Sequence, residues 1–184
     1  MSVRDVFRSL VPIVILDWNR RRKKTQVRNA LAQKKNTGAV WTKERLVDSL
    51  RSAGVQYGVD LLVHSAMSRI GYVEGGPKTV VDALREVIGP EANLLMPTSP
   101  VTTLQAKHPQ EVFSVLETPS KMGAITEYFR SNIAIERSAH PLEPVAVDGP
   151  DAEWYTRGHH TDGTPYGPQS PWMLSLIHIS EPTR

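Results

Sequence analysis

Residues 60–96, DLLVHSAMSRIGYVEGGPKTVVDALREVIGPEANLLM, decide the fold, because they predict a strand, a helix and a second strand in succession. Asp60 to Val63 is a short apolar run typical of a buried strand. Gly75-Gly76-Pro77 begins a helix with proline at its favoured first position, and Gly89-Pro90 ends that helix. Asn93 to Met96 is again apolar and predicts the second strand.

The flanking sequence continues this alternation of helices and strands. Thr42 is a suitable N-cap for a helix that ends at Gly54. Ser120 is expected to cap a helix carrying Met122, Ile125, Tyr128 and Phe129, and Pro144 to Val147 reads as a short extended piece. Helices between strands favour an α/β fold in which flanking helices cover a layered sheet. No internal repeat interrupts this pattern.

The charge of the chain is distributed unevenly. The net charge is +3, but residues 1–40 hold 10 of the 22 Lys and Arg and only two acids, a net of +8 that leaves −5 for residues 41–184. An acidic body argues against a nucleic-acid partner and suits a cationic substrate, because a negative cleft concentrates positive ligands. Cysteine is absent, so neither thiolate metal sites nor a Cys nucleophile are available.

Residues 1–40 form a basic leader that we separate from the globular part, residues 41–173. Its apolar run, Leu10 to Leu16, is too short to span a bilayer and precedes its basic cluster, the reverse of a secretory signal. We therefore expect a cytoplasmic protein. Residues 1–24 either make weak contact with the inner membrane surface or form a solvated leader.

The last eleven residues, LSLIHISEPTR from 174 to 184, resemble the translation of a transposase-based sequencing adapter. This resemblance predicts that the natural sequence ends near Met173 and that the domain is incomplete at its C-terminus. We therefore leave His178 out of the functional argument. The alternative is a genuine C-terminal strand.

Four blocks stand out among the polar residues: HSAMSRIGYVEGGPKTVVDAL from His64, LLMPTSP from Leu94, RSAHPLEPVAVDGPDAEWY from Arg137, and HHTDGTPYGPQSP from His159. In this order and spacing they resemble the aminoglycoside 3-N-acetyltransferase family. The resemblance covers about Trp41 to Trp172. It implies that family's antibiotic acetyltransferase fold and acetyl-CoA as donor. No metal is implied, and histidine spacing typical of zinc sites is absent.

The first block combines hydroxyls, one guanidinium and a helix start, which suit a pantetheine arm and phosphates. On spacing alone, the favoured explanation is a tight strand-to-helix connection whose glycines serve only the turn. The resemblance implies a coenzyme site lined by five side chains: His64, Ser65, Met67, Arg69 and Thr98.

Acetyl transfer to an amine needs a base, because a protonated nitrogen cannot attack a thioester, and histidine suits this task at neutral pH. The family signature places the catalytic histidine seven residues before the glycine of a YG..SP motif, which implies His160 from Gly167, with its neighbour His159 as the second candidate. His140 and Asp162 are expected to position the substrate. The family's acidic partner for the base is expected beyond the end of this chain.

The leading functional hypothesis is an aminoglycoside 3-N-acetyltransferase that confers antibiotic resistance. A related hypothesis is an N-acetyltransferase for an amino sugar in surface-polysaccharide synthesis. A third, from another class, is a truncated and inactive fragment. The sequence carries no indication of an oligomeric state.

Overall fold

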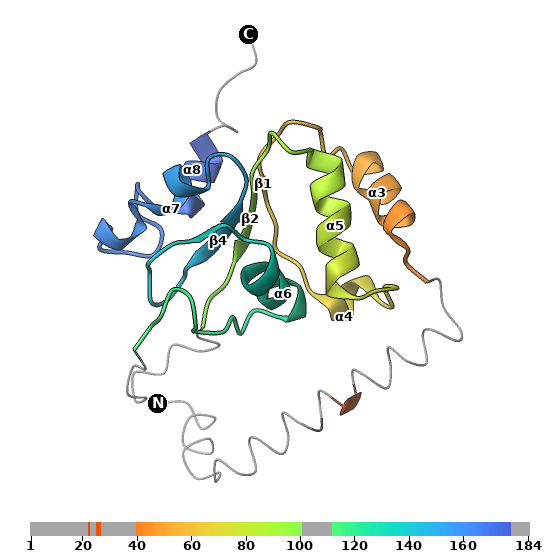
Figure 1. Ribbon diagram of the computed structural model, residues 1–184, viewed down its shortest axis with the longest axis horizontal. Coiled ribbons are helices and arrows are strands. Elements are labelled where there is room, and N and C mark those ends of the chain that lie inside the picture. The colour runs from red at the N-terminus through yellow and green to blue at the C-terminus, as the bar shows by residue number, and fades with distance from the viewer. Residues whose placement is uncertain (1–21, 23–24, 27–39, 101–111, 178–184) are drawn as a thin grey trace, which may run out of the picture. The chain divides into compact units, whose positions relative to one another are not determined.

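The computed structural model describes residues 22, 25–26, 40–100 and 112–177 (Figure 1). The chain divides into two compact units, Met1–Val40 and Trp41–Arg184. Only residues 22, 25, 26 and 40 of the first unit are described, so the predicted membrane contact of residues 1–24 lies almost wholly outside them. Among the helices that are described, none has the length and apolar character needed to cross a membrane.

The second unit is built on a four-stranded mixed sheet. The strands are β1 (Leu61–Leu62), β2 (Leu94–Pro97), β3 (Glu136–Arg137) and β4 (Val145–Asp148), in the order β1-β2-β4-β3. β1 pairs with β2 in parallel, whereas β4 is antiparallel to both β2 and β3. Consequently β1, β2 and β3 all end at the same edge of the sheet, and β4 begins there.

Helices cover both faces of this sheet, as Figure 1 shows. On one face lie α3 (Lys43–Ser52), α5 (Pro77–Ile88) and α6 (Ala124–Asn132). On the other face lie α7 (Ala152–Thr156) and α8 (Pro171–Ile177). Two short helices, α4 (Met67–Ile70) and the 3-10 helix η1 (His159–Thr161), belong to the connections. The predicted layered α/β fold is confirmed. α8 continues past Met173, the residue near which the adapter-like tail predicts that the natural sequence ends. That end point stays a prediction.

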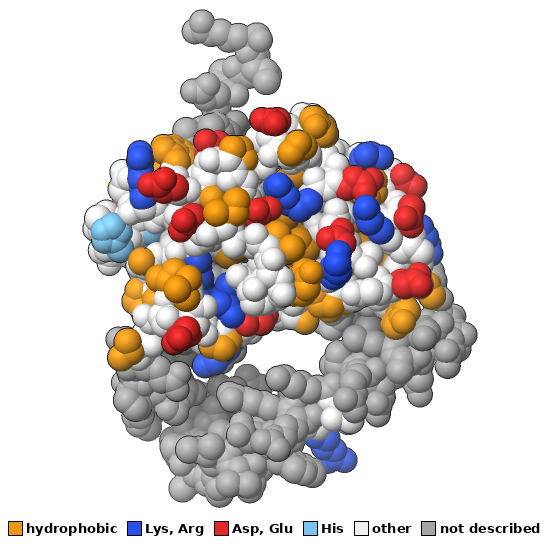
Figure 2. Space-filling view, viewed as in Figure 1, with side chains coloured by type: hydrophobic (Ala, Val, Ile, Leu, Met, Phe, Trp, Pro, Cys, Tyr) orange, Lys and Arg blue, Asp and Glu red, His pale blue; other side chains and the backbone are white. Residues whose placement is uncertain are grey.

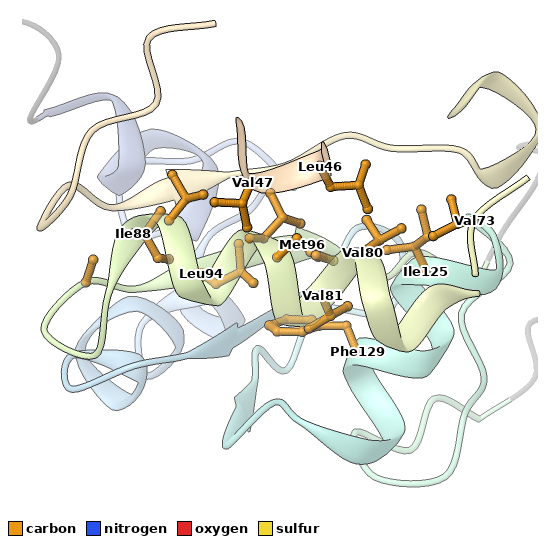
Figure 3. Close-up of a cluster of buried hydrophobic side chains, with 14 of the residues drawn as sticks. Leu46, Val47, Val73, Val80, Val81, Ile88, Leu94, Met96, Ile125 and Phe129 are labelled. Carbon is orange, nitrogen blue, oxygen red and sulfur yellow. The ribbon is translucent and has the colours of Figure 1, made fainter. Parts of the chain in front are cut away.

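Side-chain alternation along β2 creates the two cores. Leu94 and Met96 point to the α3, α5 and α6 side, whereas Leu95 packs with the α7 and α8 side. The larger core is centred on α5, whose apolar stripe faces the sheet, with Phe129 and Ile125 of α6 beside it (Figure 3). Each fully buried aliphatic side chain of this kind stabilises the fold by about 1.5–3 kcal/mol.

The helix starts show where local sequence signals were sufficient. Thr42 caps α3 by accepting a hydrogen bond from the Arg45 amide at 3.4 Å, and Pro77 opens α5 as predicted. The prediction that Ser120 caps the next helix is wrong, because α6 begins at Ala124 after Gly123. Ser120 lies three residues before Gly123, the residue that precedes α6, and its amide donates to the Glu127 carboxylate at 2.6 Å.

A polar network fixes the opposite end of the sheet, where β1 and β2 begin. The backbone amide of Asn93 donates to the Asp60 carboxylate at 2.7 Å. The side-chain Nδ2 of Asn93 donates to Asp60 and to Asp151, each at 3.1 Å. In return, the Asp151 amide donates to Asn93 Oδ1 at 2.9 Å, and the Tyr155 hydroxyl donates to Asp60 at 2.7 Å. The network therefore joins β1, β2 and the start of α7.

Gly149 passes close to this network and gives a test of its rigidity. Its φ is +150°, and a Cβ there would contact Asn93 Oδ1 and lie 2.7 Å from Asn93 Cα. We expect Gly149→Ala to lower the free energy of unfolding by about 2–4 kcal/mol through backbone strain and overpacking. Urea denaturation measures this loss.

Gly163→Ala is the matched control for that measurement. A Cβ at Gly163 meets nothing within 4 Å, and its φ lies outside the positive range. We expect a change within about 0.5 kcal/mol, as for ordinary surface substitutions. If Gly149→Ala and Gly163→Ala had the same free energy of unfolding, the close approach of Gly149 to Asn93 would be contradicted.

Candidate functional site

The edge where β1, β2 and β3 end collects most of the polar side chains from the four blocks. β1 leads into His64 and Ser65, β2 into Thr98, and β3 into Ser138 and then His140. Ligands of α/β proteins commonly bind outside the carboxyl ends of parallel strands. The candidate site therefore lies at this edge.

The Ser65 hydroxyl is the clearest sign that the edge can accept a ligand. Its Oγ is buried, and it has no hydrogen-bond partner among the described residues. Buried polar atoms are nearly always paired, and one left unpaired costs about 1–3 kcal/mol. The Ser65 hydroxyl can therefore donate a hydrogen bond to a polar group of a ligand or accept one from it.

His159 is held in one neutral tautomer by two hydrogen bonds. Its Nε2 lies 2.9 Å from the Pro165 carbonyl oxygen, which can only accept, so the ring carries its proton on Nε2. Nδ1 then accepts from the Ser138 hydroxyl at 2.8 Å. The ring is 0% exposed and both nitrogens are occupied, so His159 serves to attach η1 to the sheet.

His140 stacks on His159, with ring centroids 4.6 Å apart and planes 15° from parallel. Its Nδ1 accepts from the backbone amides of Leu142 at 3.3 Å and Glu143 at 3.2 Å. The neutral ring therefore carries its proton on Nε2, which makes it a hydrogen-bond donor rather than a base. This geometry is compatible with the predicted positioning role of His140.

Both stacked rings favour the neutral state. Burial lowers the pKa of His159 below its ordinary value; the Pro165 carbonyl opposes this shift, and the neighbouring His140 adds to it. Burial likewise lowers the pKa of His140, opposed by the charge of Asp162. Protonating either ring would place a cation against the other in a partly desolvated space.

Arg137 is a buried guanidinium that ties three segments together. It donates to the Thr98 hydroxyl at 3.0 Å and the Thr98 carbonyl at 2.7 Å, and to the carbonyls of Val115 at 3.0 Å and Thr118 at 2.6 Å. Burial, with the nearby Arg130, lowers its pKa to about 10. Arg137 thereby connects β3 to the end of β2 and to the segment before α6.

Comparison with known proteins identifies the family. The family described as aminoglycoside 3-N-acetyltransferase matches residues 62–176. The chain belongs to this family. It is 32% identical over 153 residues to aminoglycoside N(3)-acetyltransferase VII of Streptomyces paromomycinus, covering 75% of this chain and 52% of that protein. The chain spans about half the length of the curated relatives it matches.

Solved structures of family members share the fold. AAC-VIa bound to sisomicin is 33% identical with a TM-score of 0.64, covering 76% of this chain and 57% of that one. AAC-IIIb in a binary complex with CoASH is 26% identical with a TM-score of 0.64, covering 77% and 57%. The family fold expected from the four sequence blocks is therefore confirmed.

The predicted coenzyme residues occupy different environments at the edge. His64 is exposed, with its ring centroid 5.4 Å from that of Trp172, and Arg69 is exposed on α4. Met67 is partly buried against the larger core. Thr98 is 0% exposed, and its hydroxyl donates to the Pro144 carbonyl at 3.1 Å while accepting from Arg137. These assignments stay predictions. For Thr98 to bind the coenzyme through its hydroxyl, the hydrogen bond to Pro144 or the one from Arg137 would have to break.

His160, the predicted base, lies at the surface in the middle of η1. Figure 2 shows histidine reaching the surface over the segment that follows α7. No hydrogen bond to its ring is found within the described part of the chain. Asp162 accepts a hydrogen bond from the Gln169 amide at 3.0 Å, which closes the loop that follows His160. Within that part of the chain, no group of three acidic or histidine side chains could hold a metal ion.

Sequence reasoning did not identify Ser138 and Trp172 as members of the site. Ser138 lies two residues before His140 in the third block, and its hydroxyl also accepts from the Val145 amide at 2.9 Å. The only sequence signal was its place in the block, because its partner His159 is 21 residues away. A shallow cavity of about 250 Å³ beside Val55 and Leu61 lacks titratable side chains and lies away from these residues.

The stacked histidines predict a decrease in stability at acidic pH. Because their native pKa values lie below the unfolded value of about 6.5, their stabilisation is fully present above that pH. It is lost as the pH falls through 6.5 toward the native values. Urea denaturation between pH 8 and pH 5 should show this decline, and His159→Gln should reduce its slope.

Ser138→Ala tests the contribution of the hydrogen bond to His159 separately from that of the buried ring itself. This variant keeps both imidazoles but removes the partner of His159 Nδ1. We expect lower stability at every pH with the acid-dependent slope retained. A slope unchanged in His159→Gln would contradict the role assigned to this ring.

Proposed function

We propose that the protein transfers the acetyl group of acetyl-CoA to an amine of an aminoglycoside and so confers antibiotic resistance. The observation that carries the proposal is the meeting of the first and fourth blocks at one edge of the sheet. His64, next to Ser65, contacts Trp172, which lies in the block that contains His160. A donor site and a base on these two segments would face a common acceptor.

The relatives support this choice of substrates. The structures of family members include one with CoASH and one with sisomicin, a cationic amino sugar. The net charge of −5 over residues 41–184 suits such a substrate, since opposite charge raises its local concentration. We further propose a cytoplasmic location, where acetyl-CoA is available. Membrane contact by residues 1–24 stays a prediction.

In the proposed reaction, His160 accepts a proton from the sugar ammonium. The neutral nitrogen attacks the acetyl carbonyl carbon and a new C–N bond forms. The C–S bond of the thioester then breaks, the nitrogen loses its extra proton to become an amide, and the leaving thiolate takes up a proton, directly or through solvent, so that CoA is released as the free thiol. The His160 side chain is exposed and has no hydrogen-bond partner among the described residues, so a sugar nitrogen can approach it. Backbone amides or a hydroxyl stabilise the oxyanion, and His140 Nε2–H and Asp162 position the sugar.

The coenzyme would bind at the Ser65 loop. His64, Ser65, Met67 and Arg69 lie within six consecutive residues between β1 and α5. The unpaired Ser65 hydroxyl supplies a hydrogen bond to a polar group of the pantetheine arm, and the exposed Arg69 guanidinium supplies charge for a phosphate.

Ser65→Ala tests the coenzyme assignment. Because this hydroxyl has no hydrogen-bond partner in the described part of the chain, its removal should leave the melting temperature unchanged or slightly higher. The Kd for CoA should rise roughly 2- to 10-fold, the value of one neutral hydrogen bond. Isothermal titration calorimetry measures this, and an unchanged Kd with lowered stability would contradict the assignment.

His160→Ala tests the base. We expect the rate of acetyl transfer to sisomicin to fall at least about a hundredfold, the usual contribution of a general base, with CoA affinity unchanged. The ring is exposed, so folding should not be affected. Product formation is followed by release of the free thiol.

Arg157→Ala provides the control for this variant. Arg157 is exposed and lies three residues before His160, outside the proposed site. It should retain full turnover. Turnover of His160→Ala equal to that of Arg157→Ala would eliminate His160 as the base.

A further inference from the structure

Three aromatic rings from distant parts of the chain meet beside the candidate site. The Trp172 ring of α8 lies 5.4 Å from the His64 ring and 5.5 Å from the Tyr166 ring, measured between centroids. The His64 and Trp172 planes are tilted by 39°, whereas Tyr166 meets Trp172 edge-on at 76°. We call these residues the aromatic trio; the proposed reaction assigns no step to Tyr166 or Trp172.

One member of the trio, Trp172, is held by the protein, and the other two are exposed to solvent. The Trp172 indole donates from Nε1 to the Glu143 carbonyl at 3.2 Å and packs against the core formed by Leu95 and Val147. Tyr166, in contrast, is 56% exposed, and His64 is also exposed. Large exposed rings held on a rigid base at a polar edge are typical of binding surfaces rather than of a core.

The position of the trio decides which ligand it fits. His64 immediately precedes the Ser65 loop, and Tyr166 lies in the loop that follows His160, between Asp162 and Gln169. The trio thus joins a neighbour of the proposed donor loop to the loop that follows the proposed base. In the proposed reaction the acceptor lies between donor and base, whereas the adenine of the coenzyme lies a full pantetheine arm away from the thioester.

We infer that the aromatic trio binds a ring of the cationic amino-sugar acceptor and so contributes to substrate specificity. The inference rests on the proposed function for the identity of the acceptor. The apolar face of a sugar ring packs on aromatic carbons, and its ammonium groups are attracted to the ring faces. The nearby carboxylate of Asp162 adds attraction for a cation within the same loop.

Tyr166→Leu is the most direct test, because an exposed ring can be removed without disturbing the core. We expect the Kd for sisomicin to rise about 5- to 30-fold, corresponding to loss of a partly desolvated cation–π contact. The Kd for CoA and the melting temperature should not change. Tyr166→Phe retains the ring and should bind sisomicin within about twofold of the original protein.

Trp154→Leu is the matched control. Trp154 is a partly exposed aromatic residue, 38% accessible, that packs edge-on against Tyr155 on α7, outside the trio. It should leave the Kd for sisomicin unchanged. Calorimetric titrations with sisomicin and with CoA on all four proteins complete the comparison.

The outcomes distinguish this inference from the proposed function. Weaker sisomicin binding in Tyr166→Leu alone supports the trio, even if the protein proves unable to transfer acetyl groups. An unchanged Kd for sisomicin overturns the inference, even if acetyl transfer is observed. A loss of CoA affinity in place of sisomicin affinity overturns it as well, because the trio would then belong to the coenzyme site. Absence of sisomicin binding by the unaltered protein also overturns it.

Discussion

The hydrogen bond between Ser138 and His159 is the constraint on which the candidate site depends. Ser138 is the residue at which β3 leaves the sheet, and its hydroxyl simultaneously accepts from Val145 and donates to the His159 ring. This contact anchors η1 against the sheet and thereby fixes where the adjacent His160 lies. Because the His159 ring must remain neutral to accept this bond, the attachment is also sensitive to pH.

The two ends of the sheet have different tasks. At the end where β1 and β2 begin, the side chains of Asp60, Asn93 and Tyr155 are joined by hydrogen bonds. At the other end, the Ser65 hydroxyl finds no hydrogen-bond partner among the residues that the structure describes, and the rings of His64, His160 and Tyr166 are exposed. Rigidity at the first end positions α7, from which the chain continues directly into η1 and the histidine segment.

The sequence predicted the elements whose signals are local and strong. Thr42, Pro77 and Gly89 mark helix ends that depend only on neighbouring residues, and the structure confirms them. Ser120 is not the cap, because the helix begins only at Ala124, after Gly123 with its φ of +144°. β3 is a two-residue strand containing two charged residues, so no apolar pattern could reveal it. Its existence depends on pairing with β4.

The site was predictable only as four separate blocks. Spacing and family resemblance led to the prediction of His64, His140 and His160 as site residues, which stays a prediction. They gave no sign that His64 would lie against Trp172, 108 positions later in the sequence. The neutral tautomers of His140 and His159 also depend on carbonyls, amides and a hydroxyl brought near by folding. Such pairings arise from the sheet order, which a single sequence does not specify.

Chemical-shift mapping by NMR tests most directly whether donor, acceptor and base share one edge of the sheet. Coenzyme A and sisomicin would be titrated separately into the isotopically labelled protein. Both should perturb resonances of residues 64–69 and 159–172, with the coenzyme acting most strongly on the first segment and the amino sugar on the second. Perturbations confined to other surfaces, such as the cavity beside Val55 and Leu61, would contradict this location of the active site.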